Sequence, residues 1–147
     1  MWSRLKRWWK GRIGPAHLDT GLWGEKQAEV YLRRRGMSIL GRRVRAGRRD
    51  EIDLVARDGS SLVFVEVKTR RNEDFGRPMD SVDRRKRQTL SRGAVRYLRA
   101  RGGPGLPFRF DVVEVIGAET DAREPSIRHI PNAFPLDRRY QVPSRPY

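Results

Sequence analysis

The chain has 147 residues, no cysteine and a formal net charge of +15, from 33 lysines and arginines against 18 acidic residues. This length is typical of a single domain, and the missing cysteines exclude disulfides, thiolate metal sites and cysteine nucleophiles. No run of about 18 apolar residues occurs, so we expect no membrane span and a cytoplasmic protein.

Arginine supplies most of the positive charge, with 28 arginines against five lysines. The planar guanidinium group binds phosphate through a fork of donors, so the composition favours nucleic acid or an anionic membrane surface as the partner. A codon bias that places arginine on solvated faces would give the same count. Composition alone therefore leaves the kind of partner open.

Residues 1–19 form a basic, tryptophan-rich segment that we treat as separate from the domain. Helical spacing of Trp2, Leu5 and Trp9 would give a crude amphipathic face. Such a face could lie on anionic lipid or stack on single-stranded bases, and the segment could also dock on the domain or be disordered. It lacks the apolar region of a secretory signal peptide.

A helix is predicted from Thr20 or Gly21 to about Arg35. It carries a stripe at spacings of three and four residues that contains one carboxylate; the stripe is Leu22, Glu25, Ala28 and Leu32. A carboxylate that faces the core is unfavourable unless it is paired, so Glu25 should either meet a basic side chain or join a metal site. The alternative is an exposed glutamate in the first turn, where the helix dipole favours negative charge.

A β-hairpin is predicted to carry the candidate active site. Residues 51–57 alternate between polar and apolar, whereas residues 62–65 are all apolar, so the second strand should be covered on both faces. Asp58-Gly59 is a turn signal. A loop of two or of four residues brings Asp53 and Glu66 to the same face, diagonally or directly opposite, because side chains alternate with a period of two.

The convergence of Asp53 and Glu66 would be unfavourable without a counter-ion. Two carboxylates about 5 Å apart repel by roughly 3 kcal/mol at an effective dielectric constant of about 20. Mg²⁺ takes oxygen ligands and often uses only one or two carboxylates, so it would offset this repulsion. Lys68 lies on the same face and could hold a water or stabilise a phosphate, as phosphodiester hydrolysis requires. The alternative is a structural ion pair between Glu66 and Lys68, with Asp53 solvated at a strand edge.

A second helix is expected to present a basic surface. Asp80 or Ser81 should cap it, and it should run to about Arg101. Its outer face is positive and is not balanced by acids at i, i+4 spacing, so it should remain free for phosphates. The residues predicted to bind nucleic acid are Arg70, Arg71, Arg84, Arg85, Lys86, Arg87 and Arg92.

The remaining elements complete a mixed sheet. Strands are predicted over residues 37–44, 108–116 and 126–130, with a loop over 69–79 and a proline-rich extended or disordered tail over 133–147. The order helix, three strands, helix, two strands predicts an α/β fold with a mixed sheet of about five strands and helices on both faces.

The hairpin resembles the PD-(D/E)xK nuclease superfamily, with Asp53, Glu66 and Lys68 as its motif residues. The chain looks more closely like the YraN-type family of bacterial proteins, which is similar in fold to archaeal Holliday junction resolvases. The stretches that carry this likeness are Gly24-Glu25, Glu51-Ile52-Asp53-Leu54-Val55, Phe64-Val65-Glu66-Val67-Lys68-Thr69-Arg70 and Ala94-Val95-Arg96-Tyr97-Leu98. At position 50 the chain has Asp where the family pattern has Gly. The resemblance covers residues 20–132, which we take as the domain.

The resemblance implies a restriction-endonuclease-like fold and a metal-dependent attack of water on a DNA phosphodiester. It implies that Asp53, Glu66 and the Val67 carbonyl bind Mg²⁺ or Mn²⁺. It also implies that Lys68 positions the water and that Glu25 belongs to the catalytic set. Junction resolvases act as dimers, so a homodimer that cuts branched or structured DNA is expected. Two alternatives stay open: a non-catalytic nucleic-acid binding module with a vestigial motif, and a membrane-surface adaptor that uses the N-terminal tryptophans.

Overall fold

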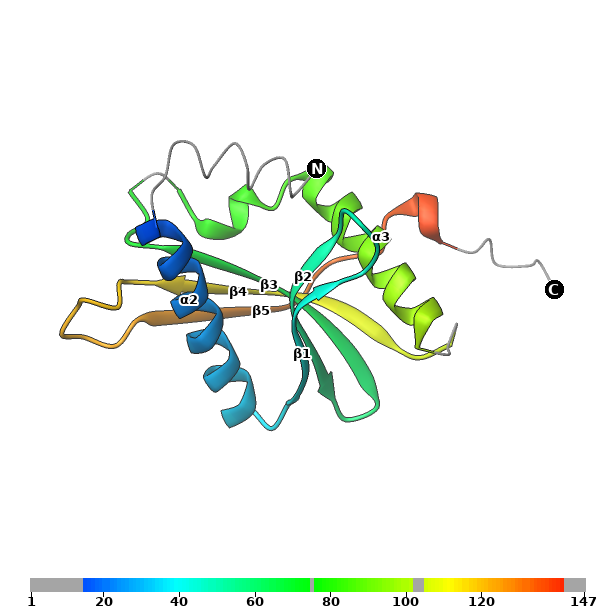
Figure 1. Ribbon diagram of the computed structural model, residues 1–147, viewed down its shortest axis with the longest axis horizontal. Coiled ribbons are helices and arrows are strands. Elements are labelled where there is room, and N and C mark those ends of the chain that lie inside the picture. The colour runs from blue at the N-terminus through cyan, green and yellow to red at the C-terminus, as the bar shows by residue number, and fades with distance from the viewer. Residues whose placement is uncertain (1–14, 75, 102–104, 142–147) are drawn as a thin grey trace.

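The computed structural model describes residues 15–74, 76–101 and 105–141 (Figure 1). Of the predicted tryptophan-rich segment, residues 1–14 lie outside the described residues. In chain order the elements are α2 (Pro15–Arg34), β1 (Ser38–Arg45), β2 (Glu51–Asp58), β3 (Ser61–Arg70), the 3-10 helix η1 (Pro78–Ser81), α3 (Arg84–Ala100), β4 (Phe108–Ile116), β5 (Ser126–Phe134) and the 3-10 helix η2 (Arg138–Tyr140).

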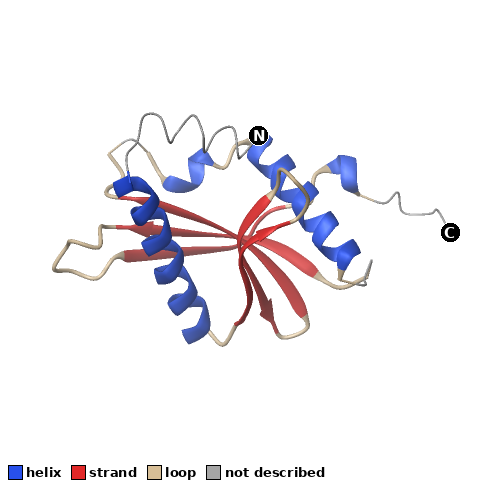
Figure 2. Ribbon diagram, viewed as in Figure 1, coloured by secondary structure: helices blue, strands red, loops and turns tan. Residues whose placement is uncertain are grey.

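The strands lie together in one twisted sheet (Figure 2). This sheet has five strands in the order β1-β2-β3-β4-β5. β3 and β4 are parallel, and the other neighbouring pairs are antiparallel. A parallel pair needs a crossover connection, which the segment that contains α3 supplies. The α/β, restriction-endonuclease-like fold with a mixed sheet is therefore confirmed.

The helices α2 and α3 cover opposite faces of the sheet, so the domain has two apolar cores (Figure 1). On one face Leu32 of α2 belongs to the same cluster as Val63 and Val65 of β3. On the other face Leu90 of α3 belongs to the same cluster as Phe64. The prediction that this strand is covered on both faces is confirmed. Because β3 is fixed from both sides, the side chains at its end have a rigid support.

The helix α2 begins at Pro15, earlier than the predicted start at Thr20. Proline is favoured in the first turn of a helix, because its fixed φ suits the helix and its missing N–H would have no partner there. The predicted domain boundary between residues 19 and 20 therefore falls inside α2. The buried stripe is also shorter than predicted: Ala28 and Leu32 are buried, but Leu22 is 39% exposed.

The helix α3 begins later than predicted. Asp80 belongs to η1, where its carboxylate accepts a hydrogen bond from the Arg77 amide at 3.1 Å. Asp83 caps α3 instead, because its side chain accepts a hydrogen bond from the Lys86 amide at 2.9 Å. The prediction that Asp80 or Ser81 caps the helix is wrong, since the chain forms a 3-10 turn before it becomes α-helical.

The last strand is longer than predicted. β5 continues to Phe134, whose ring stacks on Phe110 with the centroids 4.8 Å apart. Beyond it the Asp137 amide donates a hydrogen bond to the Ser91 hydroxyl at 3.0 Å, which ties η2 to α3. The predicted tail boundary at residue 133 therefore falls inside β5. Within the described ranges, no helix has the length and apolar character needed to cross a membrane.

Candidate functional site

The hairpin of β2 and β3 places Asp53 beside Glu66. The two strands pair from Asp58 with Ser61 to Leu54 with Val65, around a turn of Gly59 and Ser60. Gly59 has a φ of 58°, which glycine adopts without strain. One step further along this register, Asp53 stands directly opposite Glu66, the second of the two predicted arrangements. Both carboxylate residues are buried, with exposures of 4% and 2%.

The Asp53 carboxylate has an environment that favours its protonated form. Burial raises the pKa of Asp53 well above its ordinary value, and the negative charges of Glu66 and Glu25 raise it further. The positive charge of Lys86 and a hydrogen bond of 2.9 Å from the Val67 amide to Asp53 Oδ2 act in the opposite direction. The repulsion expected between two convergent acids is therefore present, and the Val67 amide fixes one of them.

Two lysines compensate the Glu66 carboxylate. Glu66 Oε1 lies 3.4 Å from the Lys68 ammonium and 3.3 Å from the Lys86 ammonium. Glu66 Oε2 is buried and accepts no hydrogen bond from the described residues. Burial lowers the pKa of Lys86, while the charges of Glu66 and Asp53 raise it. Cations from β3 and α3 thus hold one oxygen of Glu66, and the other oxygen is left without a donor among the described residues.

Lys86 is the site residue whose place was not predicted. The sequence suggested an exposed position in a basic run, but its side chain is only 11% exposed and reaches into the site. Residues 86, 90, 94 and 97 lie on one helical stripe, and the last three are buried. This periodicity is the signal that would have placed Lys86 on the inner face of α3.

Glu25 lies on the opposite helix and is paired rather than exposed. Its carboxylate accepts a hydrogen bond of 2.9 Å from Arg43 Nε, and the burial of this pair agrees with the prediction that Glu25 meets a basic side chain. The preceding residue allows the approach, because a Cβ on Gly24 would overlap the Thr69 hydroxyl oxygen. Because Gly24 has no side chain, α2 packs closely on the end of β3 and brings the charge of Glu25 near Asp53.

The donor set fits a small, hard cation with few protein ligands. Asp53 and Glu66 supply carboxylate oxygens, and Glu66 Oε2 is buried without a hydrogen-bond donor among the described residues. In the described part of the chain, no group of three or more His, Cys, Asp or Glu side chains is placed to hold a metal ion. Mg²⁺ commonly uses only one or two carboxylates and takes its other ligands from water, phosphate or backbone carbonyls, such as that of Val67.

The model of the Uncharacterised protein family UPF0102 matches residues 24–115 of this chain. The chain belongs to this family. A UPF0102 protein of Syntrophotalea carbinolica is 42% identical over 120 residues, which are 82% of this chain and 94% of the relative. UPF0102 proteins of Geobacter sulfurreducens and Nocardia farcinica are each 43% identical, over 79% and 78% of this chain and 88% and 87% of the relatives. The assignment to the YraN-type family is confirmed.

In this UPF0102 chain, Asp50 binds part of the basic surface predicted to contact nucleic acid. Its buried carboxylate accepts hydrogen bonds from Arg92 at 2.9 and 2.8 Å and from Arg96 at 3.2 Å. The hydrogen bond with Asp50 raises the pKa of Arg92. The prediction that the outer face of α3 remains free for phosphates is wrong for these two arginines, because an acid from outside the helix pairs with them. Their pairing instead fixes α3 against the start of β2, which keeps Lys86 over Glu66.

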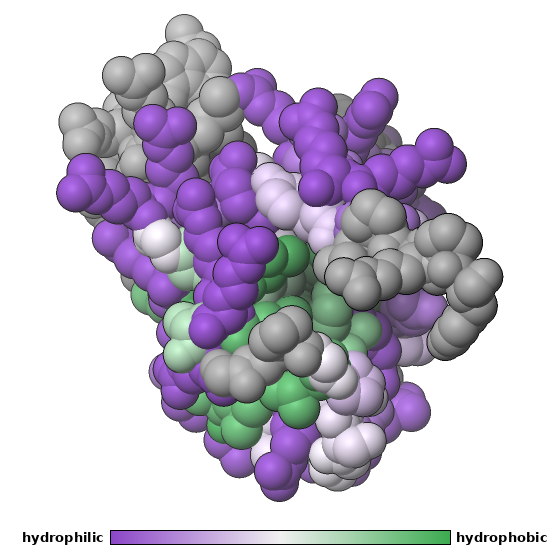
Figure 3. Space-filling view, turned by 90° about the vertical axis from the view of Figure 1, so that its right-hand side faces the viewer, coloured by the Kyte–Doolittle hydropathy of each residue, from purple (hydrophilic) through white to green (hydrophobic). Residues whose placement is uncertain are grey.

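The other predicted nucleic-acid contacts of the UPF0102 chain are exposed arginines. They are Arg70 and Arg71 at the end of β3, and Arg84, Arg85 and Arg87 at the start of α3. The face shown in Figure 3 likewise carries mostly hydrophilic side chains around a smaller apolar area. Exposed guanidinium groups on β3 and α3, the elements that carry Lys68 and Lys86, are suited to contact phosphates.

Proposed function

We propose that this protein is a metal-dependent endonuclease that hydrolyses DNA phosphodiesters with Mg²⁺ or Mn²⁺. The observation that carries the proposal is the buried pair of Asp53 and Glu66, with Lys68 and Lys86 on one Glu66 oxygen. A buried acid whose pKa is raised well above its ordinary value, as that of Asp53 is, beside a second carboxylate and lysines is typical of functional sites.

Each residue of the site has a role in this reaction. Asp53 and Glu66 would hold the cation together with the Val67 carbonyl, and the Val67 amide already fixes the Asp53 carboxylate. A divalent cation makes water a stronger nucleophile at neutral pH and stabilises negative charge on a phosphate. Lys68 would orient the attacking water and stabilise charge that develops on the phosphate. Lys86 would keep Glu66 in place from the side of α3.

The substrate in this proposal is branched or structured DNA, and the exposed arginines near the acid pair support the choice of a polyanion. A homodimer and a cytoplasmic location belong to the same proposal. Two copies would be needed to cut two strands of a junction symmetrically.

The test is a titration of Mg²⁺ and Mn²⁺ with labelled four-way junctions and linear duplexes of the same sequence. Wild type is compared with Asp53→Asn and Lys68→Met, and with the exposed control variants Glu119→Gln and Lys26→Met. We expect cleavage only with a divalent cation and a loss of about 10²-fold or more in each site variant. Calorimetry with Mn²⁺ should show binding to wild type and no binding to Asp53→Asn.

The proposal is wrong if wild type cuts neither substrate with either cation. Equal cutting by the site variants and the control variants would contradict it as well, because a contaminating nuclease gives that pattern. Gel filtration with light scattering measures the oligomeric state independently of cleavage.

A second candidate is a nucleic-acid binding module whose motif is structural. The observation that favours it is that the ammonium groups of Lys68 and Lys86 both form ion pairs with Glu66 Oε1. The protein itself therefore compensates part of the negative charge of the acid pair. This candidate predicts DNA binding that falls steeply with salt and is unchanged by EDTA and by Asp53→Asn. The endonuclease predicts that metal binding and cleavage are both lost in that variant.

A further inference from the structure

A cavity of about 550 Å³ opens where β3 ends, and arginines line it. Its lining includes three arginines, Arg70, Arg71 and Arg77, and one acid, Asp80. Asp80 Oδ2 accepts the hydrogen bond from the Arg77 amide, so this acid is engaged in the turn itself. Arg77 is paired with Glu114 and Asp80 is the one acid of the lining, so the excess of positive charge comes from Arg70 and Arg71, and Asn72 and Ser81 add neutral polar groups.

The cavity continues the line of side chains that forms the acid site. Glu66, Lys68 and Arg70 are alternate residues of one strand, so they lie on the same face and are spaced by about 6.7 Å from one Cα to the next. Phosphates of a nucleic-acid strand recur every 3–4 Å of axial rise, about 3.4 Å for one strand of B-DNA. If a nucleic-acid strand lies along β3 with one phosphate at the acid pair, another phosphate a few nucleotides further along that strand would reach Arg70.

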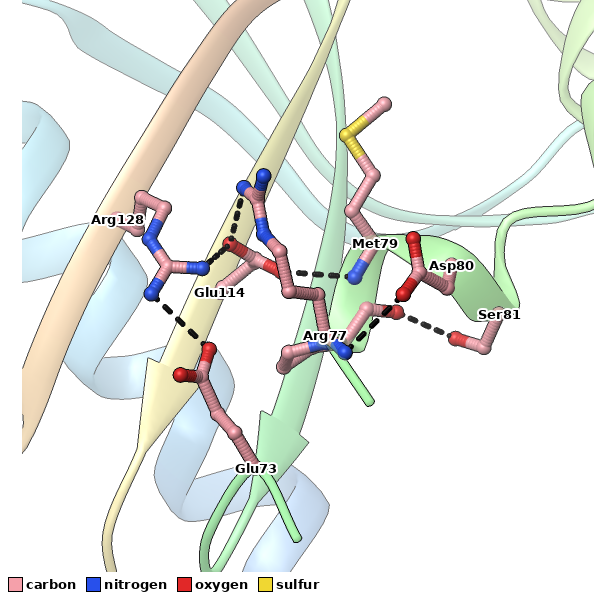
Figure 4. A network of polar contacts seen from close by, with 8 residues as sticks. Glu73, Arg77, Met79, Asp80, Ser81, Glu114 and Arg128 are labelled. Carbon is pink, nitrogen blue, oxygen red and sulfur yellow. Dashed lines mark hydrogen bonds and ion pairs between the residues drawn. The ribbon is translucent and has the colours of Figure 1, made fainter. Parts of the chain in front are cut away.

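The segment that shapes the cavity is held by a buried carboxylate of the neighbouring strand (Figure 4). Glu114 stands beside Lys68 in the parallel pairing of β3 and β4. Its Oε2 accepts a hydrogen bond of 2.7 Å from the Met79 amide, and its Oε1 lies 3.3 Å from Arg77 Nη2.

The start of the same segment is tied to this carboxylate through an arginine of β5. Arg128 Nη1 lies 2.8 Å from Glu114 Oε1, and Arg128 Nη2 lies 3.0 Å from Glu73 Oε1 (Figure 4). The end of the turn is thus bound to Glu114 directly, and its start is linked to Glu114 through Arg128. A cation pocket that is held in this way needs little rearrangement to bind an anion, which lowers the entropic cost of binding.

We propose that this cavity is a preformed subsite for a backbone phosphate of the nucleic acid, a few nucleotides from the phosphate at the acid pair. The inference rests on nucleic acid as the substrate class of the proposed function, but it does not require that the protein cuts. Arg70 and Arg71 supply the charge, and Glu114 with Arg128 keeps the turn in the shape that receives the phosphate.

The test measures DNA binding in EDTA, where no cleavage occurs, by fluorescence anisotropy over a series of salt concentrations. The variant Arg70→Gln/Arg71→Gln removes two charges from the cavity, and Arg34→Gln/Arg57→Gln removes two exposed charges elsewhere. We expect Arg70→Gln/Arg71→Gln to bind DNA more weakly and to reduce the magnitude of the slope of log K against log salt by about 1 for each lost contact. The control Arg34→Gln/Arg57→Gln should keep the slope of wild type. The single variant Arg71→Gln gives the same comparison if the double variant unfolds.

A parallel titration with inorganic phosphate separates a free phosphate ligand from a nucleic-acid backbone. An equal loss of slope in both double variants would overturn the proposal, because charge alone would then explain binding. Loss of inorganic phosphate binding in the cavity variant with unchanged DNA binding would also overturn it. Wild type that binds DNA through the cavity but never cuts it would contradict the endonuclease and leave the subsite supported.

Discussion

Replacing Asp53 by asparagine is expected to stabilise the metal-free protein, although it removes a proposed metal ligand. Burial raises the pKa of Asp53 well above its ordinary value, and the charges of Glu66 and Glu25 raise it further. Asparagine has no charge and keeps an oxygen that can accept the hydrogen bond from the Val67 amide. The substitution therefore removes an unfavourable charge without leaving that amide unpaired.

The expected gain in the free energy of unfolding is about 1–3 kcal/mol at about pH 8. The upper limit is the repulsion between two carboxylates about 5 Å apart at an effective dielectric constant of about 20. The lower limit allows for the attraction of Lys86 and the Val67 hydrogen bond, which stabilise the charged form. For a chain of this length the unfolding midpoint would rise by about 2–4 °C for each kcal/mol.

The gain must depend on pH with a defined sign. Asp53 has a higher pKa in the folded protein than the value of about 3.9 in an unfolded chain, so the folded state binds its proton more tightly. The stability that this proton contributes is fully present below about pH 3.9 and is lost as the pH rises through the folded pKa. Asparagine does not titrate, so the two proteins should be about equally stable in acid and should diverge as the pH rises.

The assay is urea unfolding followed by far-ultraviolet circular dichroism, in EDTA, over a series of pH values. Asp50→Asn is the matched control, because Asp50 is equally buried but is bound by Arg92 and Arg96. Its substitution should destabilise the protein by about 2 kcal/mol or more, since it removes the charged partner of two guanidinium groups. The reasoning is refuted if both variants lose stability, or if the gain in Asp53→Asn is the same at every pH.

Three further predictions concern the same region. Lys86→Met should lower the free energy of unfolding by about 1–3 kcal/mol at neutral pH in urea titrations, because the buried Glu66 loses one of its cations. Mn²⁺ at about 100 times its dissociation constant should stabilise wild type by about 2.7 kcal/mol in thermal unfolding, and Asp53→Asn should show no such shift. Gly24→Ala should lower the free energy of unfolding by about 1–3 kcal/mol, because its Cβ would overlap the Thr69 side chain, and adding Thr69→Ala should restore part of it.

Local sequence patterns were sufficient to predict most of the fold. The alternation of residues 51–57, the apolar run of 62–65 and the Asp58-Gly59 turn signal predicted the central hairpin, because each reflects contacts within a few residues. The sequence left the loop length undecided between two and four residues. The structure has a two-residue turn, Gly59 and Ser60, but its pairing of Arg57 with Leu62 is the one expected for the four-residue loop. The error at the start of α3 has a similar origin, because Asp80 and Asp83 are both plausible caps by sequence alone.

The composition of the site was harder to predict, because its contacts join distant parts of the chain. Asp53 and Glu66 were found through hairpin geometry, whereas Lys86 comes from another element and reaches Glu66 across the sheet face. Asp50 and Arg92 are 42 residues apart, and no local pattern links them. The periodicity of α3 could have placed Lys86 on its inner face, but only the three-dimensional packing of α3 on the sheet shows that Lys86 reaches Glu66 and that Arg92 and Arg96 pair with Asp50.

The charges of the site are better explained by function than by stability. Three acids, Asp53, Glu66 and Glu25, meet three cations from three elements, Arg43 of β1, Lys68 of β3 and Lys86 of α3. Buried ion pairs of this kind often contribute less stability than apolar residues of the same size would, because their desolvation offsets their attraction. A cluster that is costly for folding, with one buried carboxylate oxygen left without a donor among the described residues, is what a cation-binding site requires. A structural role predicts the opposite result in the central experiment: if the cluster served only the fold, neutralising Asp53 would destabilise the protein instead of stabilising it.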